Sequence, residues 1–191
     1  MILALLLALS ACGGGAEGSQ AEQLALELRG AYLALEGCTA SIEVTADYGQ
    51  RVYQYAMDLS WQREGETVIT LTAPQEVAGV TARLREGESA LEYDGVRVET
   101  GALDTQGLSP LEGAPLLLET LQTGFLAECV LEDWDGVEAL HLTSRDPERA
   151  PGDGREIQIW LDAGTGAPLR GEITWEGETV IQCVFTAFSG T

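Results

Sequence analysis

The sequence contains no lysine, and its ten basic residues, all arginines, face 31 acidic residues in a chain of 191. The formal net charge is -21 at pH 7. A surface this acidic repels the phosphates of nucleic acids and the head groups of anionic lipids. We therefore expect no nucleic-acid partner, and any attachment to a membrane must depend on something other than surface charge.

The chain is also poor in the groups that most catalytic and metal sites need. Its one histidine, His141, precedes Ser144 and Asp146, but residues three apart on a strand point to opposite faces, and no Gly-x-Ser-x-Gly motif is present. The cysteines lack metal-ligand spacing such as Cys-x-x-Cys, and the acidic turn at 132–136 lacks the oxygen ligands of a calcium loop. We expect no catalytic residue, no metal and no cofactor, and hence no enzyme.

No hydrophobic run is long enough to span a bilayer, but the chain opens with a short one. Residues 1–11 are apolar over about the length of a signal-peptide core, although the usual positive n-region is missing, and they lead into Leu9-Ser10-Ala11-Cys12. This segment resembles the bacterial lipobox. The resemblance implies a signal peptide at 1–11, diacylglycerol and palmitate on Cys12, and a flexible tether at 12–20. The protein would then be extracytoplasmic and lipid-anchored to the bacterial cell membrane; an ordinary secretory signal with a chance cysteine is the alternative.

Periodicity predicts a helix followed by a sheet. Apolar residues recur at helical spacing from Glu22 to Glu36, and after Gly37 the period changes to two. Alternating runs separated by glycine-bearing turns then predict strands at 38–46, 52–61, 67–73, 80–85, 90–93, 96–100, 128–134, 137–144, 156–161, 169–175 and 179–188. Between the two sets of strands, Pro115 and Gly124 bracket an apolar segment that predicts a central helix of about ten residues.

The pair of glycines around Thr165 could be taken for a phosphate-binding loop. Such a loop requires a helix N-terminus after the glycines, whereas here a proline and another strand follow. The sequence therefore predicts the turn of a hairpin. Its marked positions are Trp160, Asp162, Thr165, Gly166, Pro168 and Glu172.

This hairpin, together with the order of the predicted elements, resembles the LolA/LolB-like lipoprotein superfamily. The resemblance implies that residues 21–191 form one α+β domain. Its strongly curved antiparallel sheet of ten to eleven strands would be an unclosed half-barrel, with an N-terminal helix and a central helix covering the concave face. The central segment PLEGAPLLLETLQTGF is similar to that of the GerS-like germination branch of the superfamily.

The resemblance implies binding without catalysis. We expect a hydrophobic ligand, acyl or lipoprotein-like, in the concavity of the sheet. The alternative is a GerS-like protein that binds and activates a spore-cortex amidase, a cell-wall hydrolase, during sporulation or germination. An enzyme acting on envelope polymers through paired carboxylates stays a third alternative, because nothing selects two of the 31 acids.

The predicted ligand-binding wall joins one face of the second strand to the central helix. Alternation like that of the strand is equally typical of a half-buried core. Replacing Leu118 with aspartate is expected to abolish ligand uptake and leave the fold intact. The sequence leaves open whether the concavity is packed, the oligomeric state, the number of host membranes, and a disulfide among Cys38, Cys129 and Cys183. The wall consists of Tyr53, Tyr55, Met57, Trp61, Leu117, Leu118 and Leu121.

Overall fold

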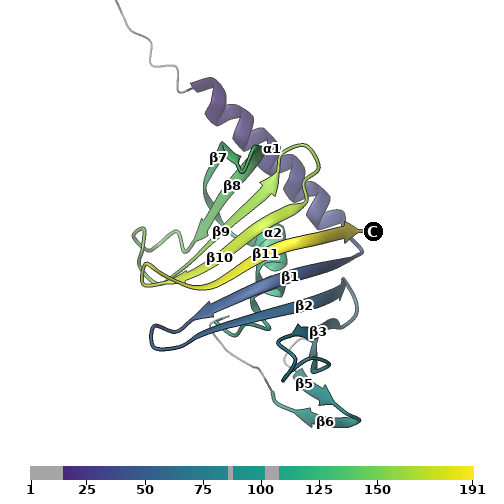
Figure 1. Ribbon diagram of the computed structural model, residues 1–191. Coiled ribbons are helices and arrows are strands. Elements are labelled where there is room, and N and C mark those ends of the chain that lie inside the picture. Colours follow the sequence, from purple (N-terminus) through teal and green to yellow (C-terminus); the bar gives the residue numbers. More distant parts are fainter. Residues whose placement is uncertain (1–14, 86–87, 102–107) are drawn as a thin grey trace, which may run out of the picture.

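The computed structural model describes residues 15–85, 88–101 and 108–191 (Figure 1). The expected signal peptide and the lipidation site Cys12 lie outside these ranges. Within them, no helix combines the length and the apolar character needed to cross a bilayer.

Two helices and eleven strands make up the described part of the chain. The helices are α1 (Gly15–Ala34) and α2 (Gly113–Thr123), and the strands are β1 (Gly37–Asp47), β2 (Val52–Gln62), β3 (Thr67–Ala73), β4 (Thr81–Arg85), β5 (Glu88–Tyr93), β6 (Val96–Glu99), β7 (Leu126–Trp134), β8 (Val137–Arg145), β9 (Arg155–Asp162), β10 (Pro168–Trp175) and β11 (Glu178–Gly190).

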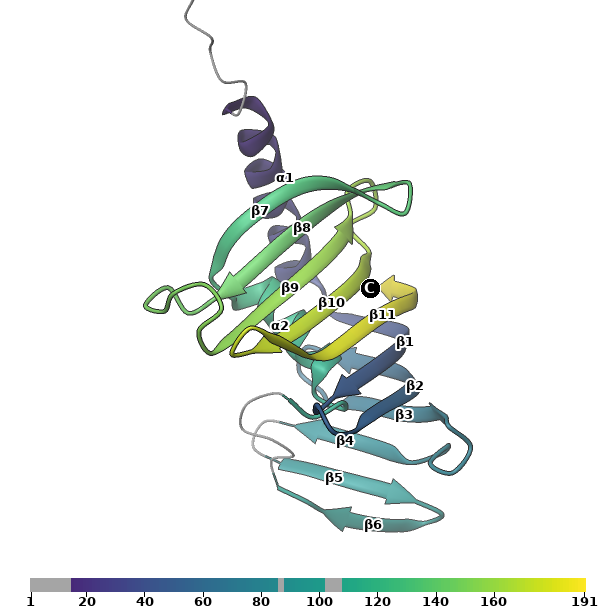
Figure 2. The same ribbon diagram turned by 60° about the vertical axis from the view of Figure 1, so that its left-hand side comes forward.

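All eleven strands join one antiparallel sheet in the order β6-β5-β4-β3-β2-β1-β11-β10-β9-β8-β7. The first and last strands of the domain therefore pair at its centre, with Val44 opposite Cys183. Figure 2 shows the sheet curving around α2, while α1 runs from the β7 side toward the end of β11. The sheet does not close, because β6 and β7 end it on opposite sides. The expected α+β fold, an unclosed half-barrel with two helices on its concave face, is confirmed.

The first helix begins earlier than expected. The helix was predicted from Glu22, with a flexible tether through residue 20, whereas α1 begins at Gly15. The intervening residues include alanine, glutamate and glutamine, which favour helix, so helical structure continues through part of the expected tether. The prediction relied on a repeating apolar face, and that signal is weak before Leu24.

The core lies between the concave face and the helices. Alternate residues of the central strands are buried, among them Ile42, Val44, Ile181 and Cys183. The helix α2 sits directly on β9, β10 and β11. Close contact is possible because β10 carries Gly171 where the Leu117 side chain descends, and a Cβ there would overlap that side chain. Packing this tight between helix and sheet fixes the position of α2.

The three cysteines of the described chain are free thiols. Burial raises the pKa of Cys183 to about 12 and that of Cys38 to about 11. Both thiols therefore stay protonated and behave as small apolar core residues.

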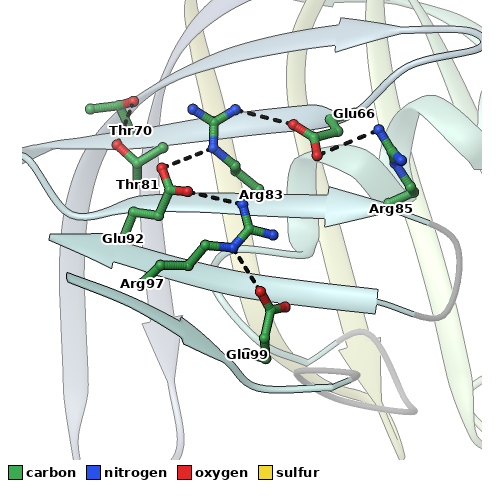
Figure 3. Close-up of polar contacts among 8 residues, drawn as sticks. All are labelled: Glu66, Thr70, Thr81, Arg83, Arg85, Glu92, Arg97 and Glu99. Atoms are coloured by element: carbon green, nitrogen blue, oxygen red, sulfur yellow. Dashed lines mark hydrogen bonds and ion pairs between the residues drawn. The ribbon is translucent and has the colours of Figure 1, made fainter. Parts of the chain in front are cut away.

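Arginines link β4, β5 and β6, the strands at one end of the sheet, across its convex face (Figure 3). Arg83 donates to Glu66 at 3.1 Å and to Glu92 at 2.9 Å. Arg97 in turn donates to Glu92 at 3.0 Å and to Glu99 at 2.7 Å. Because β6 is exposed along its whole length and buries little apolar surface, these bonds add to the backbone pairing that joins β4, β5 and β6.

We expect Arg83→Met to loosen this end of the sheet. The hydrogen bond from Arg83 lowers the pKa of Glu92. Its contribution to stability is therefore complete above the unfolded pKa of glutamate, about 4.3, and is lost as the pH falls through the lower folded value. Hydrogen-exchange protection of β4 and β5 should fall in the variant at pH 7, and its dependence on pH between about 3 and 5 should weaken, with the part due to Arg97 remaining. Equal protection in Arg83→Met and in the loop control Arg149→Met would contradict this role.

Candidate functional site

The predicted wall is built from two elements that meet in the core. Leu117, Leu118 and Leu121 of α2 are only 1%, 3% and 3% exposed. They belong to one apolar cluster with Met57, against which Tyr55 and Trp61 pack. The structure thus brings six of the seven predicted residues together. In the described conformation, however, these side chains belong to one packed core, and those of α2 are buried against β9, β10 and β11, so the concavity beneath α2 is filled.

The seventh residue, Tyr53, lies on the same face of β2 as Tyr55 and is nearer to the solvent. Its ring stacks on Tyr55 at 6.4 Å between centroids and meets the edge of Tyr48 at 6.1 Å. The Tyr48 hydroxyl donates to the carbonyl oxygen of Leu108 at 2.8 Å. An aromatic row therefore runs along β2 from the core to the surface.

The concave face continues from β2 across β3, β4, β5 and β6, and the sequence had not placed residues of these four strands in the predicted wall. Strand register places Leu59 opposite Ile69, Ile69 opposite Ala82, Ala82 opposite Leu91 and Leu91 opposite Val98. The first three of these residues are buried, whereas Val98 is 56% exposed. The alternation of 96–99 was visible in the sequence, but only the register shows that its apolar residues share a face with the core.

A hollow of about 510 Å³ lies between the C-terminal half of α1 and the end of β11. Leu28 and Ala31 contribute from α1, Leu35 contributes from just after its C-terminal end, and Phe188 contributes from β11. The ring of Tyr32 also lines it and lies 6.3 Å from that of Phe188. The hollow is bounded on its third side by the turn of the β9–β10 hairpin. Its walls are mainly apolar, and none of its lining residues belongs to the predicted wall.

The hairpin marked in the sequence positions α1. Oδ1 of Asp162 accepts the backbone N–H groups of Gly164 and Thr165 at 2.9 and 2.7 Å, and the bond from Thr165 lowers the pKa of Asp162. Gly166 has φ of 72°, and its carbonyl oxygen accepts the buried Tyr32 hydroxyl at 2.8 Å. The turn therefore holds the helix wall of the hollow in place.

The other hairpin positions lie in the strands beside this turn. Pro168 is buried at the start of β10. Trp160 and Glu172 lie on the convex face, where Trp160 Nε1 donates to Glu132 at 2.6 Å and Glu172 accepts Arg170 Nε at 2.8 Å. The first contact connects β9 to β7, and the second lies within β10.

His141, Ser144 and Asp146, which were considered from the sequence as a catalytic triad, do not lie together in the structure. His141 stacks on Trp160 on the convex face, 4.2 Å between ring centroids, and contacts Gln158. Ser144 is buried on the other side of the sheet, and Asp146 caps its own loop by accepting the N–H of Glu148. Among residues 15–85, 88–101 and 108–191, His, Cys, Asp and Glu side chains form no cluster suited to a metal ion.

The fold and the hollow define a class of protein, the open half-barrels whose helices cover an apolar concave face. No protein-family model and no curated protein matches the sequence. Among solved structures, the chain is similar to an uncharacterized conserved protein from Thermus thermophilus, with 13% identity, a TM-score of 0.51, and coverage of 89% of this chain and 87% of that chain.

Two further similarities have lower TM-scores. A putative outer membrane lipoprotein-sorting protein domain from Vibrio parahaemolyticus has 13% identity and a TM-score of 0.49, covering 91% of this chain and 93% of that chain. A chain of the CwlD amidase complex with the GerS lipoprotein from Clostridioides difficile has 12% identity and a TM-score of 0.44, covering 88% and 94%. The fold that the LolA/LolB-like resemblance implies is the fold observed, and identities this low concern the fold alone.

Proposed function

We propose that the protein is a lipid-anchored extracytoplasmic lipoprotein that binds a hydrophobic ligand without catalysis. The observation that supports this proposal best is the apolar hollow of about 510 Å³ beside α1. Binding pockets for small molecules measure about 300–1,000 Å³ and are mostly apolar. Each methylene group that leaves water for such a site contributes about 0.8 kcal/mol, so an acyl chain is the ligand class that fits.

The attachment to the membrane is a separate part of the proposal. It depends on the lipobox-like segment ending at Cys12 and on no contact within the folded domain. An acyl anchor would hold the acidic domain at a membrane that its surface charge repels. Mass analysis of the mature protein would detect acyl groups on Cys12, and an unmodified cysteine would contradict this part alone.

The predicted wall takes part in binding under one condition. Leu117, Leu118 and Leu121 can contact a ligand only if α2 moves away from β9, β10 and β11, since these side chains are buried against the sheet. We propose that the hollow receives the ligand first, and that Tyr55, Met57 and Trp61 are reached only in such an opened state.

The first experiment is native mass spectrometry of the chain, expressed in a bacterial periplasm and purified without detergent. A bound mass that is removed by organic solvent would support the proposal and identify the ligand class. Filling the hollow with Ala31→Trp should then reduce the bound fraction about tenfold or more. The control is Leu33→Trp, on a residue of the same helix that is 47% exposed and does not line the hollow.

Two results would overturn the assignment. If Ala31→Trp retains the ligand as well as Leu33→Trp does, the hollow is not the site. If wild-type protein has only its own mass even after incubation with palmitate, the binding of an acyl ligand is excluded. The alternative, a protein partner such as a cell-wall amidase, would then be pursued.

A further inference from the structure

The two edges of the sheet differ in how well they are protected against pairing. Open edge strands tend to pair with other strands, and proteins limit this with short strands, charges or covering elements. The strand β6 has four residues, and an internal ion pair links Arg97 to Glu99. The strand β7 has nine residues, and α1 packs on its concave face. Its outer edge has no strand partner in the part of the chain that the structure describes.

The convex face of β7 carries a regular pattern of charge and apolar surface. Glu128, Val130 and Glu132 pair with Thr143, His141 and Ala139 of β8, respectively, and so share one face. Val130 is 51% exposed. The Glu128 and Glu132 side chains are 59% and 39% exposed. An incoming strand would therefore meet an acidic, an apolar and an acidic position in succession.

The two carboxylates are held in place by neighbouring side chains. Glu128 accepts Arg145 Nη1 at 3.0 Å. Glu132 accepts Trp160 Nε1 at 2.6 Å, and its Oε1 lies 3.3 Å from His141 Nδ1. These contacts orient both groups along the convex face while leaving part of each exposed, so little side-chain freedom remains to be lost when a cation binds.

The pattern selects against a second copy of this chain. The antiparallel pairing that brings Val130 against Val130 would place Glu128 of each copy opposite Glu132 of the other. Like charges directly opposite on paired strands are destabilising, and each copy carries a net charge of -21. The complementary strand instead has a basic residue, an apolar residue and a basic residue at alternate positions.

We propose that the outer edge of β7 is a docking strand for an extended basic segment of a protein partner. The partner segment adds antiparallel to β7, so its arginine or lysine side chains meet Glu128 and Glu132 and its central apolar side chain covers Val130. Main-chain hydrogen bonds supply the affinity of such strand addition, and the side chains on one face supply its specificity.

The test uses the full chain and a synthetic peptide, acetyl-Thr-Arg-Thr-Val-Thr-Arg-Thr-amide, with binding measured by calorimetry and by NMR shifts of backbone amides. We expect shifts concentrated on β7 and β8. Glu128→Gln combined with Glu132→Gln should weaken binding about tenfold or more, since glutamine keeps an acceptor for Trp160 but removes the charge. The control removes two other exposed acids, by Glu43→Gln with Glu64→Gln, and should bind as wild type does.

Two peptide analogues distinguish strand addition from attraction between charges. Each is N-methylated at alternate residues, so only one of them loses the N–H groups that face β7. One analogue should lose binding and the other should keep it. Equal binding of both analogues, equal loss in the two double variants, or dimerisation of the chain through β7 would each overturn the proposal.

Discussion

Replacing Leu118 with aspartate is expected to destabilise the fold strongly. The sequence by itself suggested that this variant would lose its ligand and keep its fold, and the structure corrects that expectation. Leu118 is 3% exposed within the core cluster, so an aspartate would bury a carboxylate among apolar side chains. The loss in free energy of unfolding should be about 4 kcal/mol or more, and urea denaturation followed by circular dichroism would measure it.

Leu26→Asp is the matched control, because the same substitution falls on a leucine of α1 that is 71% exposed. Its effect should be within about 0.5 kcal/mol. If Leu118→Asp were as stable as this control, α2 would not be packed on the sheet in solution, and the concavity beneath it would be open.

Gly171→Ala should destabilise the protein by about 1–3 kcal/mol through overpacking. A Cβ at Gly171 would lie 2.7 Å from Cδ2 of Leu117 and nearer still to Cδ1. Leu117→Ala should by itself cost about 2–5 kcal/mol because it leaves a cavity. In the double variant the new methyl group occupies part of that cavity, and the combined cost should be less than the sum of the two by about 0.5–3 kcal/mol.

Gly30→Ala provides the opposite outcome on a glycine with open surroundings. Apart from its chain neighbours and the backbone of its own helix, no atom lies within 4 Å of a Cβ at Gly30, and alanine is favoured over glycine inside a helix by about 0.5–1 kcal/mol. That variant should therefore be slightly more stable than wild type.

The double variant of Gly171→Ala and Leu117→Ala tests the position of α2. If the two substitutions had additive effects in urea denaturation, α2 would not be packed on β10 as described.

Local sequence predicted most of the strands because their patterns are local. The joints at Gly95, Gly136 and Gly177 were expected to be hairpin turns, and each glycine has a positive φ. Alternation also identified the buried face of β1, where Ile42 and Val44 are 1% exposed. The start of α1 was missed, since residues that favour helix without an apolar face give no periodic signal.

The candidate site was less predictable because it depends on distant segments. Leu28, Tyr32 and Phe188 line the hollow, but none belongs to a recognisable motif. A signal did exist in the hairpin, since Gly166 was marked as a family position. Its contact with Tyr32, 134 positions away, could not be inferred from either segment alone.

The sequence by itself determined the element types, the inward face of each strand and the acidic, lysine-free surface, because these follow from residue type and from spacing along the chain. The tertiary structure decided that the concavity under α2 is filled, that an apolar hollow lies beside α1, and that β7 is an edge strand of the sheet within the described residues. Helix position and strand order depend on contacts between residues far apart in the chain, and a periodic pattern carries no information about which distant faces meet.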